Sequence, residues 1–74
     1  MKKQRCHTDL LAKVVQRIKQ LREEKKVSQE AFYMDTDIHI ARIEAGKANI
    51  TISTLKDICD YFELSLEDFF KGIE

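Results

Sequence analysis

The sequence contains no proline and no tryptophan, and it has only two glycines and two cysteines among its 74 residues. Because residues that interrupt helices are so scarce and good helix formers dominate, we expect an all-α fold. Two cysteines are too few for a disulfide framework, which favours a reducing, cytoplasmic setting. No apolar run approaches the roughly 20 residues of a membrane span, and the N-terminus has no signal-peptide core.

The motifs of catalysis and of cofactor binding are also missing. There is no glycine-rich phosphate loop, no HExxH or CxxC motif, and no nucleophile beside a base. Cys6 and His7 are adjacent, but a zinc site would need two further ligands at short spacing. A chain of this length makes one small domain without space for a deep pocket. We therefore expect no enzyme activity, metal, cofactor or small-molecule ligand.

The net charge is zero, but the charges are unevenly distributed. Residues 1–27 hold nine Lys and Arg against three Asp and Glu, and residues 28–74 hold four against ten. This asymmetry is compatible with a nucleic-acid-binding surface on one side of the domain, or simply with the charge-rich surface of a helical protein. Residues 1–7 are basic and without periodicity. We expect them to form a flexible arm ahead of a single domain of residues 8–74.

Helical periodicity predicts amphipathic helices before and after the central part of the chain. The first is expected over residues 9–25, with a buried stripe of Leu10, Leu11, Val14, Val15, Ile18 and Leu21. Another is expected over residues 52–62, with a buried face of Ile52, Leu55, Ile58, Cys59 and Phe62. Thr51 is its expected N-cap, and Ser65 is the N-cap of a last helix. That last helix carries Phe69 and Phe70, which we expect to form the twofold interface with a second copy of the chain; the alternative is that both rings belong to the core.

Residues 28–49, SQEAFYMDTDIHIARIEAGKAN, have the pattern of a helix, a tight turn and a second helix. Ser28 is a good N-cap for the first helix, in which Tyr33 and Met34 are either core or rim. A cluster of turn and cap formers follows, and from it we expect a second helix over residues 36–45. Gly46 supplies the left-handed residue that ends this helix. This is the layout of a helix-turn-helix motif, about residues 28–45, whose second helix is presented to a partner.

Three sequence motifs, SQExF, RIExGKxN and TISTL, together resemble the Cro/phage-repressor type of helix-turn-helix, the XRE family of bacterial transcription regulators. The resemblance extends over residues 14–70. It implies a compact five-helix, lambda-repressor-like domain that binds double-stranded DNA as a homodimer, with the second motif helix in the major groove. The chain is about three residues shorter than the usual family spacing between SQE and RIE, nearly one helical turn. We expect the first motif helix to be the shortened one.

The resemblance also gives roles to side chains around the motif. Gln29, Lys47 and Asn49 are similar to family residues that contact the sugar-phosphate backbone. Arg22 matches an arginine that forms a structural ion pair with the glutamate of RIE, which is Glu44 here. A pair of this kind would hold the first helix against the second motif helix.

Within the second motif helix, Arg42 is the leading candidate for DNA contact, because arginine binds guanine through two hydrogen bonds or clamps a phosphate. His39 either donates to a phosphate or base, or is an ordinary surface histidine. Ile38 either contacts a thymine methyl or closes the core of the turn. Asp37 either caps the helix or accepts from a cytosine amine, and Thr36 either caps the helix or contacts the DNA backbone.

A second hypothesis is a helical protein–protein interaction module that keeps this fold without specific DNA binding. Its support is the acidic second half of the chain, the two aspartates Asp35 and Asp37 beside the turn, and a single arginine on the second motif helix. Salt dependence distinguishes the two hypotheses, because phosphate contacts weaken steeply as salt rises.

Overall fold

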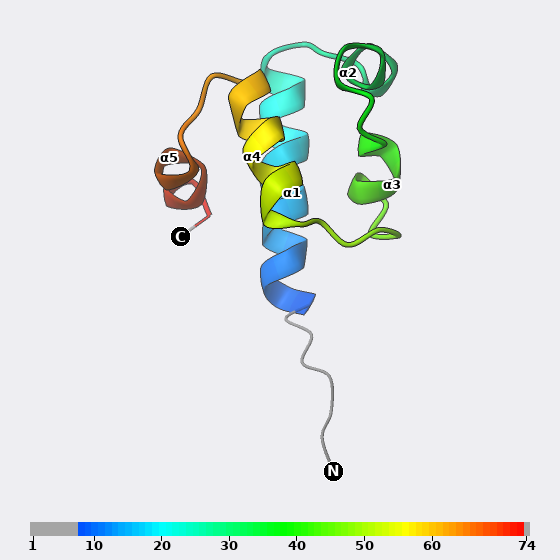
Figure 1. Cartoon of the computed structure of the whole chain (residues 1–74). Helices are drawn as coiled ribbons and strands as arrows, with labels where there is room; N and C mark the ends of the chain where they lie inside the picture. The colour runs from blue at the N-terminus through cyan, green and yellow to red at the C-terminus, as the bar shows by residue number, and fades with distance from the viewer. Residues whose placement is uncertain (1–7, 74) are drawn as a thin grey trace.

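The structure is a computed structural model that describes residues 8–73. These residues form five helices: α1 (Thr8–Glu24), α2 (Gln29–Thr36), α3 (Ile40–Glu44), α4 (Ile52–Tyr61) and α5 (Leu66–Lys71). Figure 1 shows α2 and α3 on one side of the long helix α1, α5 on the other side, and α4 in front. The all-α, five-helix prediction is confirmed. The expected arm of residues 1–7 lies outside the described part, and no described helix is long and apolar enough to cross a membrane.

The core contains residues from every helix. Its buried apolar members are Val14, Ile18, Leu21, Phe32, Ile40, Ile43, Leu55, Ile58, Cys59, Phe62 and Phe69. Phe32 packs against the rings of Tyr61 and Phe62, with centroid distances of 4.7 and 5.7 Å, and so joins α2 to α4. These contacts hold α2, the first helix of the motif, against the end of α4.

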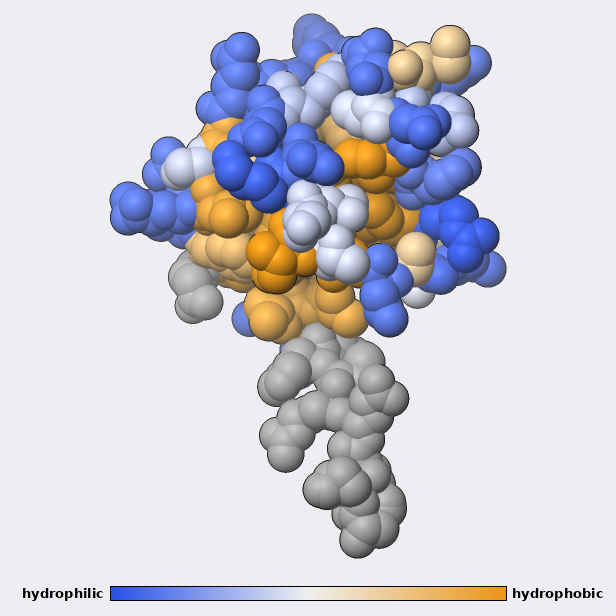
Figure 2. Space-filling view, viewed as in Figure 1, coloured by the Kyte–Doolittle hydropathy of each residue, from blue (hydrophilic) through white to orange (hydrophobic). Residues whose placement is uncertain are grey.

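Two residues that were expected in the buried stripes are exposed. Leu10 is 47% exposed and Ile52 is 72% exposed. Each lies in the first turn of its helix, and Figure 1 shows that the first turns of α1 extend beyond the other helices. Figure 2 shows apolar surface at this lower end of the molecule. The helical period was therefore right, but the helix ends have fewer neighbours than the period implies.

The predicted N-caps are confirmed at three helices. The hydroxyl oxygens of Ser28, Thr51 and Ser65 each accept a hydrogen bond, at 3.0 Å, from the backbone N–H three residues later. Each bond satisfies one of the N–H groups that have no partner inside the helix. These three helix starts are thus fixed by local sequence.

Left-handed residues end several of the helices, and most of them are not glycine. Gly46 has φ = 76° after α3, as predicted, and the N–H of Lys47 donates to the carbonyl of Arg42 at 2.9 Å. Lys26 after α1 has φ = 59° and Glu63 after α4 has φ = 57°, with the same pattern of hydrogen bonds. The pattern is the Schellman motif, in which a left-handed residue lets the last carbonyls of the helix find donors.

The turn of the motif differs from the prediction. Asp37 is left-handed (φ = 65°) and ends α2, and the Thr36 hydroxyl accepts from the N–H of Ile38 at 3.1 Å. Thr36 and Asp37 therefore finish the first motif helix, and they cannot begin the second. The second motif helix covers only residues 40–44, whereas residues 36–45 were predicted. The first motif helix has 8 residues and the second has 5, so the second is the shorter of the two.

Candidate nucleic-acid interface

The ion pair between Arg22 and Glu44 fixes α3 against α1. The Nε and Nη2 atoms of Arg22 donate to the two carboxylate oxygens of Glu44 at 2.7 and 2.9 Å, and Nη1 donates to the carbonyl of Val27 at 2.8 Å. The side chains of Arg22 and Glu44 are 11% and 5% exposed. The pair that the resemblance implied is thus present, and its guanidinium also holds the loop between α1 and α2.

Gln29 joins the same network from the start of α2. Its Nε2 donates to Glu44 Oε1 at 2.9 Å, so one carboxylate accepts hydrogen bonds from both α1 and α2. Burial raises the pKa of Glu44, but the hydrogen bonds from Arg22 and Gln29 and the positive charges of Arg22 and Lys19 outweigh burial, and the pKa lies below its ordinary value. The exposed Gln29, expected at a DNA phosphate, is therefore held in place by the protein itself.

The outer face of α3 carries a single long side chain. Arg42 is exposed there, between the small exposed residues Ala41 and Ala45, while Ile40 and Ile43 face the core. Arg42 is thus accessible to a ligand. The small neighbours leave space for that ligand to approach the helix closely.

The residues of the turn before α3 have different surroundings. Ile38 is half-buried and packs against the core, which favours the second of its two expected roles, closing the core of the turn. The Thr36 hydroxyl donates to the carbonyl of Phe32 at 2.8 Å and is occupied within the turn. Asp37 is exposed and caps α2, not α3.

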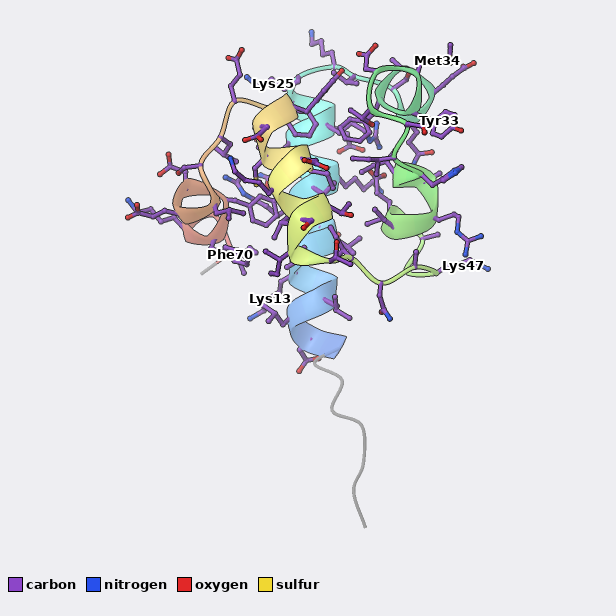
Figure 3. The ribbon with its side chains drawn as sticks, in the orientation of Figure 1. Lys13, Lys25, Tyr33, Met34, Lys47 and Phe70 are labelled. Atoms are coloured by element: carbon purple, nitrogen blue, oxygen red, sulfur yellow. The ribbon has the colours of Figure 1, made fainter. Side chains whose placement is uncertain are left out.

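The ring of His39 packs at a tilt against the ring of Tyr33, a residue whose role the sequence left open. The two ring centroids lie 4.7 Å apart with the ring planes at 35°. Tyr33 is 37% exposed, and His39 is exposed at the N-cap position of α3. Figure 3 shows Tyr33 on the outer side of the motif, at one end of α3, and Lys47 on the same side at the other end. No periodic signal in the sequence indicates this pair, because it depends on the conformation of the turn.

The loop after α3 presents Lys47 and Asn49, and both are exposed. The left-handed Gly46 turns the chain back immediately before Lys47, whose N–H is bound to α3. The outer edge of the motif therefore presents Gln29 at the start of α2, Arg42 on α3 and Lys47 after α3. All three are exposed and can bind an anion or a polar ligand.

The two aromatic rings of α5 are not equivalent. Phe69 is fully buried, and Arg17 from α1 lies 5.9 Å from its ring centroid and donates to its carbonyl at 3.2 Å. Phe70 is 37% exposed, and Figure 3 shows it on the opposite side of α1 from Tyr33 and Lys47. Phe69 is thus unavailable to a second copy, contrary to its expected place in a dimer interface, because the single chain already uses it as core.

Two helices joined by a short turn, here α2 and α3, are the layout of the helix-turn-helix class of domain. The family model described as a helix-turn-helix domain matches residues 15–74, and the chain belongs to that family. Membership indicates DNA binding in a regulatory role. No curated protein and no solved structure is significantly similar to this chain.

Proposed function

We propose that the protein is a transcription regulator of the Cro/repressor (XRE) type that binds specific double-stranded DNA sequences in the cytoplasm of a bacterium. The observation that carries this proposal is the exposure of Arg42 on a helix that the Arg22–Glu44 pair fixes in position. A helix that is already fixed loses little conformational entropy when it binds DNA. One arginine on such a helix forms two hydrogen bonds with guanine in the major groove.

The other exposed polar residues of the motif would hold the DNA backbone. Gln29, whose amide nitrogen is held by Glu44, faces a phosphate at the start of α2, and Lys47 and Asn49 contact the backbone beyond the other end of α3. Contacts of this kind set the register of the protein on the duplex, whereas base contacts set its sequence preference. Thr36 and Ile38 contribute less, because the Thr36 hydroxyl is bonded within the turn and Ile38 packs against the core. The side chain of Asp37 is exposed, but its negative charge is unfavourable beside phosphates.

A homodimer follows from the shortness of α3. Five residues make a helix about 7.5 Å long, which spans roughly two base pairs at 3.4 Å each. One copy therefore contacts too little DNA for useful specificity. Two copies on half-sites about one DNA turn apart double the recognised sequence. The exposed Phe70 is the proposed contact between the copies.

The test is selection from a random duplex pool at near-physiological salt. We expect the purified protein to enrich a palindrome with half-sites about one turn apart. If the protein retains DNA but enriches no motif, it binds DNA without sequence specificity, and the proposal of a specific regulator is wrong. If no DNA is retained, the protein-interaction module becomes the better hypothesis.

Two variants separate base contact from backbone contact on the selected operator. Arg42→Ala should weaken the operator most and relax the preference at one base pair in each half-site, because it removes the base contact of each copy. Lys47→Ala should weaken all sequences alike and reduce the slope of log affinity against log salt by about 2, because it removes one phosphate contact from each of the two copies. Affinities measured by fluorescence anisotropy from 50 to 200 mM salt check both results. Equal affinity of both variants and the parent would contradict this assignment of contacts.

A further inference from the structure

We propose that Tyr33 is a positioning residue that fixes the His39 ring for a base contact, and that this pair replaces the first turn that α3 lacks. The inference rests on the proposed function and deepens it. It adds a residue from the first motif helix to the sequence-recognising surface. Its experiment is arranged so that failure of the inference and failure of the proposed function give different results.

Within the pair, Tyr33 is the fixed ring and His39 is the ring that it orients. Tyr33 belongs to α2, which the Ser28 cap and the buried Phe32 anchor. His39 lies in the turn and forms no capping hydrogen bond with α3, so its helix does not fix the imidazole. The tilted ring contact with Tyr33, at 4.7 Å between centroids and 35° between planes, supplies the fixed surface for the imidazole.

Tyr61, in contrast to Tyr33, has a purely structural role in this domain. The hydroxyl of Tyr61 donates to Asp35 at 2.8 Å, and its ring packs edge-on against Phe32. Tyr33 lies on the outer side of α2 instead, beside His39 and above α3 in the view of Figure 3. The position of Tyr33 therefore suits a role at the DNA surface better than a role in the core.

The need for such a pair follows from the composition of α3. Its exposed face offers only Ala41 and Arg42, with Ala45 at the C-cap, and the two alanines can form no hydrogen bond with a base edge, only an apolar contact with a thymine methyl. A histidine ring at the end of α3 adds a second recognising group only if its orientation is fixed before binding, since ordering a free side chain on binding costs affinity. The contact with Tyr33 fixes the ring in advance.

The experiment compares four variants on the operator that the parent selects: Tyr33→Ala, Tyr33→Phe, His39→Ala and the double Tyr33→Ala/His39→Ala. We expect Tyr33→Ala and His39→Ala each to weaken the operator by about 30-fold, which is about fivefold, the lower end for one base contact, in each of the two half-sites. Both should relax the preference at the same base pair. The double variant should be no weaker than His39→Ala alone, and Tyr33→Phe, which keeps the ring, should bind like the parent.

Met34→Ala is the matched control, because Met34 is the next residue of α2, is 75% exposed and is not part of the ring pair. It should leave affinity and preference unchanged. A purely structural role for Tyr33 would lower the melting temperature, followed by circular dichroism, without changing the preferred base. The inference is overturned if Tyr33→Ala keeps the parent's preference at every operator position, or if the losses of the two single variants multiply in the double. If the parent selects no motif, the proposed function itself fails, and the inference fails with it.

Discussion

Replacing Arg22 with alanine would remove three hydrogen bonds at once, two to the carboxylate of Glu44 and one to the carbonyl of Val27. The Glu44 side chain, which is only 5% exposed, would then keep its charge with Gln29 as its main donor. Breaking a buried pair from one side costs about 3–5 kcal/mol, because the remaining charge is uncompensated. A domain of this size has a total stability of about 4–11 kcal/mol, so the variant should lose much of it.

Urea unfolding followed by circular dichroism measures this loss, provided that the slope with denaturant stays unchanged. Lys56→Ala is the control, since its ion pair with Asp60 is exposed and should contribute little. The double variant Arg22→Met/Glu44→Leu should recover most of the loss, because an apolar pair leaves no buried charge. If Arg22→Ala unfolds at the same urea concentration as Lys56→Ala, the claim that burial makes this pair important is refuted.

Three further predictions follow from single residues. The pKa of Glu44 is lowered in the folded state, so the ionised carboxylate stabilises the fold fully above the ordinary pKa of 4.5. This stabilisation is lost as the pH falls through the lower pKa of the folded state. Urea midpoints measured from pH 7 to 3 should show the loss in the parent and not in Arg22→Ala. Gly46→Ala should cost about 1 kcal/mol in urea unfolding, from backbone strain alone, because no atom lies within 4 Å of the added Cβ; a neutral result would contradict the left-handed geometry. Burial, with a smaller contribution from Asp60, raises the pKa of the Cys59 thiol, and Cys59 is fully buried; peptide mass mapping after maleimide treatment should find it unmodified in the folded protein and modified in urea.

The helix starts were predictable from sequence because a cap acts over three residues. Ser28, Thr51 and Ser65 each bond to a neighbour within their own segment, so the signal and the structure lie in the same stretch. The start of α3 was not predictable in the same way. Thr and Asp both begin and end helices, and only the left-handed conformation of Asp37 decides that α2 finishes there.

In the candidate site too, some features could be predicted from the sequence and others could not. The Arg22–Glu44 pair followed from resemblance, because its two residue types occur at matching positions of the family motif. The Gln29–Glu44 bond and the Tyr33–His39 ring contact were missed, since each depends on how the shortened motif places α2 beside α3. Leu10 and Phe69 were misjudged for a related reason. Periodicity identifies an apolar face, but it does not say how much of that face the rest of the chain covers.

Three left-handed residues that are not glycine, Lys26, Asp37 and Glu63, have a consequence for the evolution and engineering of this domain. The left-handed conformation destabilises the folded state by about 1 kcal/mol at a residue that has a Cβ atom, whereas glycine adopts it without this strain. Relieving one such strain raises the melting temperature of a domain of this size by about 4–8 °C. Lys26 and Glu63 lie outside the motif of residues 28–45. Replacing either with glycine should therefore raise the melting temperature without changing the residues that we propose to contact DNA.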